Sequence, residues 1–273
     1  MIRVILFDLG GVLVDWDGVG PLVELTGGRL SPEEARRFWF ESPWVSRFER
    51  GKCTPGEFAS GVVAELGLSV SPETFIEDFK SWDRGLYPGV PEMLDALRGD
   101  YILACITNNN RVYTESLIER YELDRKFHHF FVSYQTGLTK PSSEAFENVL
   151  RGIGVPPSEV VYFDDNAECV ESAARSGIRA YKVSGMGQLR ERMNFLREKG
   201  ILGTVSRARE RRVVMNAEVQ IIEGGKLVRT EKMKLKPVKE FSDDTIIYEN
   251  EDGRAVVFFR KKNEYILISI DMA

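Results

Sequence analysis

A chain of 273 residues is long enough for one large domain or two, and 43% hydrophobic with 29% charged residues is the balance of a soluble globular protein. The first apolar run meets Asp8 too early for a signal peptide, and no later run approaches membrane-spanning length, so we expect a cytoplasmic protein without membrane contact. The net charge of −5 is uneven, because residues 1–200 hold 23 Lys and Arg against 30 Asp and Glu, whereas residues 201–273 hold 14 against 12.

The N-terminal residues 3–7 form a short, mostly apolar run that predicts a buried strand. The strand ends at Asp8, which Gly10 and Gly11 follow closely. Aspartate is depleted in strands, and at the end of a buried strand it lies at the sheet edge where open α/β folds bind ligands. Asp8 is therefore a candidate functional residue, and the structural alternative is a turn aspartate that caps the two glycines.

A helical insert follows the first strand. Ser31, Thr54 and Ser71 each precede a proline, a pattern that places a hydroxyl at the N-cap and proline at the first helical position. Ser31 and Thr54 are also followed three residues later by glutamate, as in a capping box. We expect three or more short helices between residues 31 and 83, within a cap that spans residues 18–87.

Strand and helix patterns alternate beyond residue 88. The continuous apolar run at residues 101–107 is typical of a strand buried on both faces of a parallel sheet. Further strands are predicted at 129–134, 160–163 and 179–183, and helices at 88–99, 112–121, 143–153, 167–176 and 189–199. Strands separated by helices of this length predict an α/β core with a parallel sheet, built from residues 1–17 and 88–199.

The pattern changes again after residue 200. A basic segment at 206–212 is expected to belong to a linker at 200–212, and alternating apolar residues predict a small antiparallel β domain at 213–273. Its strands are expected at 213–221, 227–235, 245–250, 254–260 and 265–271. Its basic residues alternate with acids, which favours a solvated face over nucleic-acid binding. Homo-oligomerisation through this domain is a further hypothesis.

Polar side chains follow several strands of the predicted parallel sheet. Because the carboxyl ends of parallel strands lie at one edge, residues distant in sequence are expected to meet there. These candidate site residues are Asp8, Thr107, Asn108, Lys140, Asp164 and Asp165. Carboxylates, one lysine and a hydroxyl at one place suit a divalent cation, an anion and an attacking oxygen. Taken singly, the same residues fit helix caps and turns.

Four segments of the chain resemble, in order, the four motifs of the haloacid dehalogenase (HAD) superfamily: residues 7–12, 106–108, 137–141 and 162–166. The resemblance covers residues 1–198 and is closest to subfamily IA. It implies a Rossmann-like parallel core with an inserted helical cap. The small β domain that follows resembles nothing we recognise.

The resemblance also implies Mg²⁺-dependent phosphoryl transfer. The Asp8 carboxylate would attack phosphorus and form an aspartyl-phosphate. The implied Mg²⁺ ligands are Asp8, the backbone carbonyl of Gly10, Asp164 and Asp165. The implied phosphate-binding residues are Thr107, Asn108 and Lys140, of which Thr107 and Lys140 are also taken as catalytic with Asp8. The substrate would be a small phosphorylated metabolite, with a sugar phosphate favoured.

Gly10 departs from the family pattern, because most phosphatases of the superfamily carry an acid/base aspartate two residues after the nucleophile. The branch of α-glucose-1-phosphate phosphatases shares this glycine, and its next residues are similar to residues 14–17 here. An anomeric oxygen leaves more readily than an ordinary alcohol, so that branch needs less acid assistance. Asp15 or Asp17 could act through water, although a role at the cap hinge is favoured.

Other residues have more than one interpretation. Trp44, Arg47 and Arg50 are candidates for substrate contact, whereas aromatic residues at helical spacing such as Trp39 are more often core. His128 and His129 lack ligand partners and are interpreted as structural. The cysteines at 53, 105 and 169 lack ligand spacing and indicate reduced thiols.

Two other functions compete with a phosphatase. One is dehalogenation by the same Asp8 nucleophile, against which the Asp164–Asp165 pair argues because such relatives use no metal. The other is a non-catalytic binding or regulatory protein, in which Gly10 marks lost chemistry and the C-terminal β domain binds a partner.

Overall fold

The computed structural model describes residues 2–203, 215–223, 226–242, 245–249, 255–261 and 264–270. The chain divides into two compact units, Met1–Gly203 and Thr204–Ala273. The basic segment at 206–212, with most of the predicted linker, lies outside the described residues. No helix in the described part of the chain has the length and apolarity that crossing a bilayer requires.

The core of the first unit is a parallel sheet of five strands in the order β5-β4-β1-β6-β7. Its strands are β1 (Val4–Phe7), β4 (Ile102–Thr107), β5 (His129–Val132), β6 (Val160–Asp164) and β7 (Arg179–Lys182). In the centre, β1 pairs with β4 on one side and β6 on the other, and all four of its residues are buried. The predicted Rossmann-like α/β class is confirmed.

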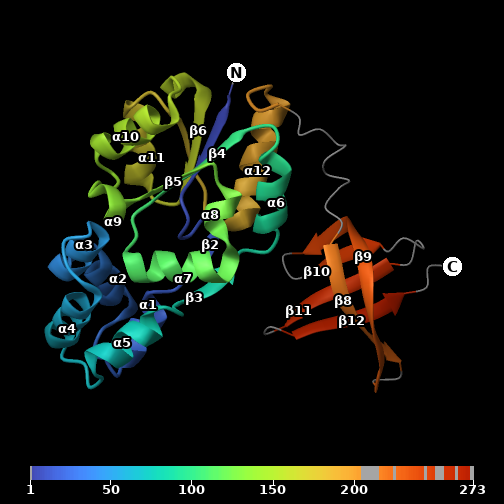
Figure 1. Ribbon diagram of the computed structural model, residues 1–273, viewed down its shortest axis with the longest axis horizontal. Helices are drawn as coiled ribbons and strands as arrows, with labels where there is room; N and C mark the ends of the chain where they lie inside the picture. Colours follow the sequence, from blue (N-terminus) through green and yellow to red (C-terminus); the bar gives the residue numbers. More distant parts are fainter. Residues whose placement is uncertain are drawn as a thin grey trace. The chain divides into compact units, whose positions relative to one another are not determined.

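Helices cover both faces of this sheet. Buried residues of β1, β4 and β6 pack against α10 (Ser143–Ile153) and α11 (Ala167–Arg175), whereas α6 (Val90–Leu97) and α12 (Gly185–Glu198) lie on the other side (Figure 1). The remaining elements after β4 are α7 (Arg111–Tyr121), α8 (Leu123–Lys126), α9 (Ser133–Thr136) and the 3-10 turn η1 (Pro157–Glu159). The central strands β1, β4 and β6 are therefore buried on both faces, as their apolar sequences require.

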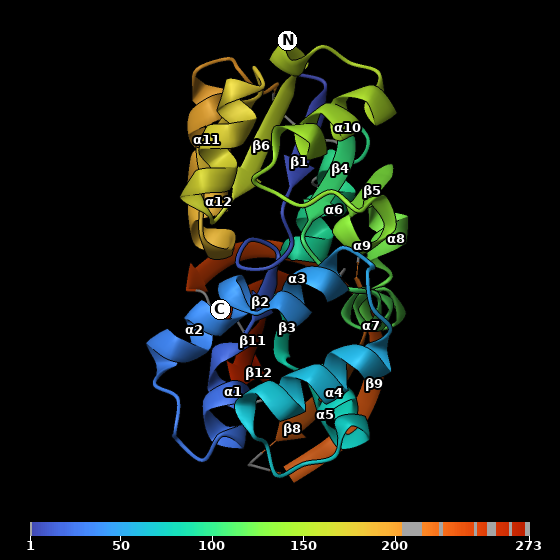
Figure 2. The same cartoon turned by 90° about the vertical axis from the view of Figure 1, so that its left-hand side faces the viewer.

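The helical insert consists of five helices between the short strands β2 and β3, and Figure 2 shows it beyond one end of the parallel sheet. They are α1 (Val19–Leu25), α2 (Pro32–Glu41), α3 (Pro43–Glu49), α4 (Pro55–Leu66) and α5 (Pro72–Phe79). Ser31 and Thr54 form complete capping boxes, and Ser71 caps α5. The capping residues begin these helices as their sequence patterns predict.

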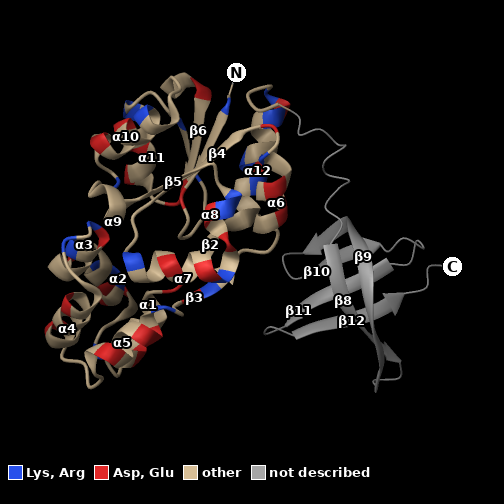
Figure 3. Ribbon diagram, viewed as in Figure 1, with Lys and Arg blue, Asp and Glu red and all other residues tan. Residues whose placement is uncertain are grey.

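The helical insert has an aromatic interior, and its helices α4 and α5 carry acidic residues on their surface. Phe75 and Phe79 of α5 are buried and lie among the rings of Phe58 and Trp82. The acidic residues of α4 and α5, red in Figure 3, include exposed side chains such as Glu77. Burial of large rings supplies the apolar area that such short helices need to remain folded.

A two-stranded antiparallel ribbon joins the helical insert to the core. It pairs β2 (Val14–Trp16) with β3 (Asp83–Leu86). Arg84 Nη2 lies 2.6 Å from Asp17 Oδ2, and Arg84 Nη1 lies 3.4 Å from Asp15 Oδ1. Asp17 Oδ1 also accepts the backbone N–H of Gly20 at 2.8 Å, at the start of α1. Both aspartates thus have partners within the ribbon and the adjoining helix.

Two predicted boundaries in the core were wrong. The strand expected at 129–134 ends at Val132 and turns into α9, because the Ser133 hydroxyl exchanges hydrogen bonds with the backbone of Asn109 and so holds the chain in a turn. The helix expected at 189–199 begins four residues earlier, at Gly185. Glycine lowers the helix propensity of that first turn, but tertiary packing, with Met186 and Leu189 buried, offsets it.

The second unit holds five antiparallel strands in the order β12-β11-β10-β9-β8. They are β8 (Met215–Glu223), β9 (Lys226–Ser242), β10 (Thr245–Glu249), β11 (Ala255–Lys261) and β12 (Glu264–Ile270). The predicted antiparallel fold is confirmed, but β9 runs past the expected end at Leu235. Its first part pairs with β8 and its last part with β10, so this strand continues across a change of partner at Lys236.

Candidate active site

Three polar residues stand at the carboxyl ends of three adjacent strands. Asp8 directly follows β1, Thr107 ends β4 and Asp164 ends β6. The order β4-β1-β6 makes these strands neighbours, and register pairs Phe7 with both Cys105 and Phe163. The side chains of Asp8, Thr107 and Asp164 are all buried. The parallel sheet therefore gathers them at one edge, as the sequence predicts.

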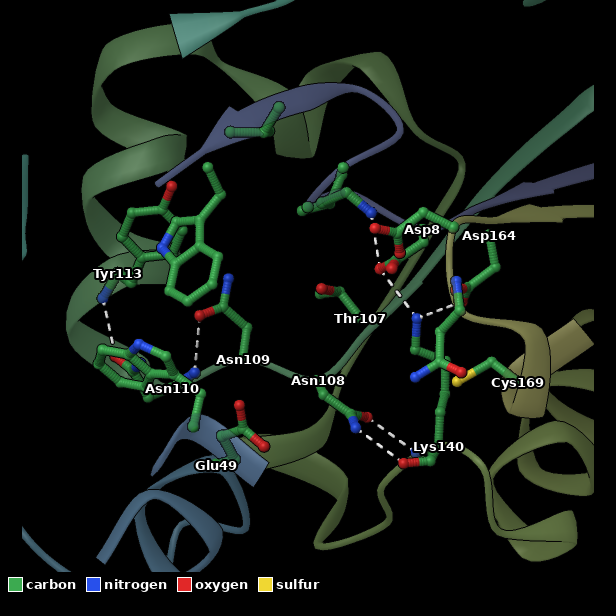
Figure 4. Close-up of a pocket in the computed structure, with 18 of the residues that line it drawn as sticks. Asp8, Glu49, Thr107, Asn108, Asn109, Asn110, Tyr113, Lys140, Asp164 and Cys169 are labelled. Atoms are coloured by element: carbon green, nitrogen blue, oxygen red, sulfur yellow. Dashed lines mark hydrogen bonds and ion pairs between the residues drawn. The ribbon is translucent and has the colours of Figure 1, made fainter. Parts of the chain in front are cut away.

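Lys140 lies between the two buried carboxylates. Its Nζ is 2.9 Å from Asp8 Oδ1 and 2.7 Å from Asp164 Oδ2 (Figure 4). Although burial alone favours the neutral amine, the carboxylates of Asp8 and Asp164 raise the pKa of Lys140. Lys140 is thus a buried cation that offsets part of the negative charge at the sheet edge.

Asn108 holds the loop that carries Lys140. The Asn108 side-chain Nδ2 donates to the backbone carbonyl of Lys140, and the backbone N–H of Lys140 donates to Asn108 Oδ1, both at 2.8 Å. The two backbone groups of Lys140 are thus tied to the end of β4. In this structure Asn108 positions the lysine through its amide, a contact that sequence reasoning did not anticipate.

Asp164 is held on several sides. It accepts from Lys140 and from the Tyr162 hydroxyl, and its Oδ1 accepts the backbone N–H of Asn166 at 2.7 Å. Burial and the charge of Asp164 raise the pKa of Tyr162, so its hydroxyl remains a donor. Tyr162 was not predicted as part of the site, since the sequence shows only a buried strand residue there. Tyr162 lies two residues before Asp164 and thus on the same face of the strand, and this spacing could have predicted their contact.

Three carboxylates crowd the site. Asp8, Asp164 and Asp165 each offer an oxygen, and these oxygens lie within 4.8 Å of one another. Burial, with the nearby charge of Asp164, raises the pKa of Asp165. For Asp8, burial outweighs the opposing effect of Lys140 and raises the pKa to about 7, with Asp164 adding to the rise. Such crowding favours a bound cation, and hard oxygen donors suit Mg²⁺.

The two glycines after Asp8 have different surroundings. A Cβ on Gly11 would lie 2.2 Å from Asp165 Oδ2, and Gly11 has a φ of +71°, so glycine lets this turn approach the acidic cluster. A Cβ on Gly10 would meet no atom within 4 Å. At the position where the resemblance predicts an acid/base aspartate, the backbone thus leaves room for a Cβ.

A cavity of about 560 Å³ opens over these residues. Its charged side holds Asp8, Thr107, Lys140, Asp164 and Asp165, and Gly10 also lines it. The opposite side comes mainly from the helical insert and the adjoining ribbon, with Trp16, Trp39, Phe40, Val45, Phe48, Phe58 and Phe79. One carboxylate joins this apolar side, that of Glu49 at the end of α3 (Figure 4). Sequence reasoning assigned Glu49 no role, because the sequence alone does not show which side of its helix faces the cavity.

Three residues of the insert region expected to contact substrate, Trp44, Arg47 and Arg50, do not line this cavity. Arg47 lies over the ring of Trp44, 4.9 Å from its centroid. Arg50 donates to Thr139 Oγ1 at 3.2 Å. Trp39, expected in the core, does line the cavity, and its Nε1 donates to the backbone carbonyl of Gly18. One side of α3, with Val45, Phe48 and Glu49, therefore faces the cavity, and the side with Arg47 faces away from it.

Comparison with known proteins identifies the family. The family model of haloacid dehalogenase-like hydrolases matches residues 2–177. Phosphatase MT3486 of Mycobacterium tuberculosis is 28% identical over 75% of this chain and 96% of its own length. D-ribitol-5-phosphate phosphatase of Bacteroides thetaiotaomicron is 24% identical over 72% of this chain and 98% of its own length.

Solved structures share the fold of the first unit. A HAD-like hydrolase from Porphyromonas gingivalis superposes with a TM-score of 0.62 at 23% identity, covering 72% of this chain and 98% of that protein. The HAD enzyme bt-2542 of Bacteroides thetaiotaomicron, in complex with magnesium and inorganic phosphate, gives a TM-score of 0.58 at 24% identity, covering 67% and 94%. Together with the family match, these likenesses lead to one conclusion: the chain belongs to the haloacid dehalogenase-like hydrolases.

Proposed function

We propose that the protein is a Mg²⁺-dependent phosphomonoesterase that acts on a small phosphorylated metabolite through an aspartyl-phosphate. The observation that carries the proposal is the buried Asp8 carboxylate, held by Lys140 beside Asp164 and Asp165 in the floor of a cavity. Phosphatases among its relatives support hydrolysis of phosphate esters. A cytoplasmic location stays a prediction.

In the proposed reaction Asp8 is the nucleophile. The backbone N–H of Leu9 donates to Asp8 Oδ1 at 2.7 Å, and Lys140 contacts the same oxygen, so this oxygen is fixed and Oδ2 remains to attack phosphorus. The Lys140 ammonium and the Thr107 hydroxyl are the donors for the oxygens that stay on phosphorus. Asn108 was expected to bind phosphate, and in this proposal it also keeps Lys140 in place.

The acidic cluster fits Mg²⁺. Asp8, Asp164 and Asp165 supply carboxylate oxygens, and the Gly10 carbonyl is the proposed backbone ligand. When bound, the cation would neutralise phosphate charge as the transferring group moves. The neighbouring fold of bt-2542 was crystallised with magnesium and phosphate, which is in keeping with this assignment.

The helical insert is proposed to be the substrate-selecting cap, with boundaries at residues 18–87 and a core of 1–17 and 88–199. Its aromatic side chains form an apolar wall, and flat rings of this kind pack against the C–H faces of a carbohydrate. A sugar or sugar-alcohol phosphate is the favoured substrate, which agrees with the name of the ribitol-phosphate relative. The role of residues 213–273 in homo-oligomer assembly remains a prediction.

The alternatives have less support. Dehalogenation would use Asp8 without metal, and the three crowded carboxylates argue against it because they need a counter-charge. A non-catalytic binding protein has no need to keep a buried lysine between two carboxylates, an arrangement that is costly to desolvate.

The test is phosphate release from an aryl phosphate and from a panel of sugar, sugar-alcohol and carboxylated phosphate esters, with Mg²⁺ and with chelator. We expect Mg²⁺-dependent turnover and a preference within the panel. Activity that is unchanged by chelation would contradict the metal assignment. Absence of turnover on every ester would favour the binding protein.

A further inference from the structure

The proposed reaction lacks one group. An alkoxide leaving group must acquire a proton, and the residue that supplies it in most relatives is replaced by Gly10. Titratable side chains that line the cavity within the described residues are Asp8, Glu49, Tyr113, Lys140, Asp164, Asp165, Cys169 and Lys182. The proton donor, if it is a side chain, belongs to this set.

Most of that set is unsuitable. The three aspartates form the proposed cation site, and Lys140 is paired with two of them. Burial raises the pKa of Tyr113, and it raises the pKa of Cys169 to about 12, so both hold their protons too tightly for exchange near neutrality. Lys182 is exposed at the end of β7. Glu49 remains.

Glu49 occupies a distinctive position. It is the last residue of α3 and enters the cavity from the helical insert, across from the Asp8 side (Figure 4). Among the described residues its carboxyl group has no hydrogen-bond or ion-pair partner, whereas the core carboxylates Asp8 and Asp164 both have them. A carboxyl group that lines a cavity without a protein partner is free to bond to a ligand.

The charges around Glu49 suit proton exchange. Burial raises the pKa of Glu49 to about 7, against the opposing effects of Lys140 and Arg50 and with a further rise from Asp8. Both protonation states are therefore populated near neutral pH, as a residue that gives a proton and later takes one back requires.

We propose that Glu49 is the general acid and base of this phosphatase, replacing from the helical insert the aspartate that Gly10 removes from the core. The inference rests on the proposed function. In this assignment, α3 lies on the side of the cavity where the leaving group departs. Hydrolysis of alkyl esters, whose alcohols are poor leaving groups, should therefore depend on Glu49.

The proton balance is complete over two steps. First, Asp8 Oδ2 bonds to phosphorus, the bond from phosphorus to the ester oxygen breaks, and that oxygen takes its electron pair and the Glu49 proton, leaving as an alcohol. Second, water attacks the aspartyl-phosphate, Glu49 takes a proton from that water, and Asp8 is released as a carboxylate with inorganic phosphate. Neither step needs another reactant.

The experiment compares Glu49→Gln with wild type on two substrates, an aryl phosphate and the best alkyl ester of the panel. Glutamine keeps the size of the side chain but cannot exchange the proton. We expect kcat/KM for the alkyl ester to fall by about 10²–10⁴-fold, with a much smaller change for the aryl ester because its leaving group needs no proton. Glu33→Gln, an exposed residue of α2 that does not line the cavity, is the matched control.

Two further measurements keep the inference falsifiable. For wild type, kcat/KM on the alkyl ester should rise with pH as Asp8 ionises and fall again as the Glu49 carboxyl loses its proton, because the pKa of each group is about 7. Glu49→Gln should keep the rise and lack the fall. Gly10→Asp places an acid in open space beside Asp8, so the double variant with Glu49→Gln should regain turnover of the alkyl ester.

Other outcomes would overturn the inference. Equal loss of kcat/KM on both substrates would assign Glu49 to substrate binding, and no loss of kcat/KM on either would remove it from the first step. A lower kcat on the aryl ester alone is expected, because Glu49 also activates the water of the second step. Failure of wild type to hydrolyse even the aryl phosphate would instead overturn the proposed function, and the inference with it.

Discussion

The two sides of the cavity are stabilised by different interactions. On the core side, Asp8, Lys140 and Asp164 come from strand ends and adjoining loops, and each is buried and bonded to another charged group. On the side of the helical insert, the lining is aromatic and its one carboxyl group, Glu49, has no partner among the described residues. In the proposed function, the core side would hold the phosphate and the cation, and the insert side would contact the rest of the substrate.

The difference has an energetic reason. Burying a charge is costly unless it is paired, so the core-side charges must come as a network, and removal of one member leaves the others uncompensated. The insert side is stabilised by ring burial, which is non-directional and tolerates a single neutralisable acid. We therefore expect substitutions on the core side to affect all substrates, and those on the insert side to separate one substrate from another.

The largest expected effect follows from Asp8→Asn, which removes the proposed nucleophile and keeps the shape of the side chain. Turnover of every phosphate ester should fall by at least about a thousandfold, because no other group can form the covalent intermediate. Phosphate release measures the loss, and circular dichroism checks that the fold is retained. Substantial residual turnover would mean that water attacks phosphorus directly.

Lys140→Met comes next and affects stability as well as rate. It leaves Asp8 and Asp164 buried without their shared cation, so unfolding free energy should fall by about 3 kcal/mol and turnover by about 10²-fold or more. Denaturant unfolding and steady-state kinetics check both effects. Mg²⁺ should restore part of the stability, since it supplies another counter-charge to the same carboxylates.

Gly11→Ala tests the approach of the glycine turn to the acidic cluster. The added Cβ would meet Asp165 Oδ2 at 2.2 Å, so Asp165 must move, and the Mg²⁺ concentration for half-maximal activity should rise about tenfold or more. Gly27→Ala is the matched control, since Gly27 also has a positive φ, +61°, but its Cβ would meet nothing within 4 Å. Both variants should lose about 1 kcal/mol of stability, but only Gly11→Ala should change the response to Mg²⁺.

The smallest expected effect is that of Arg84→Ala in the ribbon between the two sides. Its ion pairs with Asp15 and Asp17 are exposed, so the loss of stability should stay below about 1 kcal/mol. Turnover of the aryl phosphate should change little, because neither aspartate lines the cavity. A large loss of turnover would implicate Asp15 or Asp17 in the chemistry and weaken the assignment to Glu49.

The amino-acid sequence by itself determined the core side of the site. Asp8, Thr107 and Asp164 end apolar runs, and a parallel sheet brings the ends of adjacent strands to one edge, so local patterns were enough to predict their meeting. The caps at Ser31 and Thr54 were predictable for a similar reason, because a capping box is completed within four residues.

Only the tertiary structure decided the rest. Whether α3 presents Glu49 or Arg47 to the cavity depends on how this helix packs against its neighbours, and no spacing within α3 specifies it. The bonds from Asn108 to the backbone of Lys140 span 32 residues and could not be read from either segment alone. Contacts of this kind depend on packing between distant segments, which periodicity and capping signals do not encode.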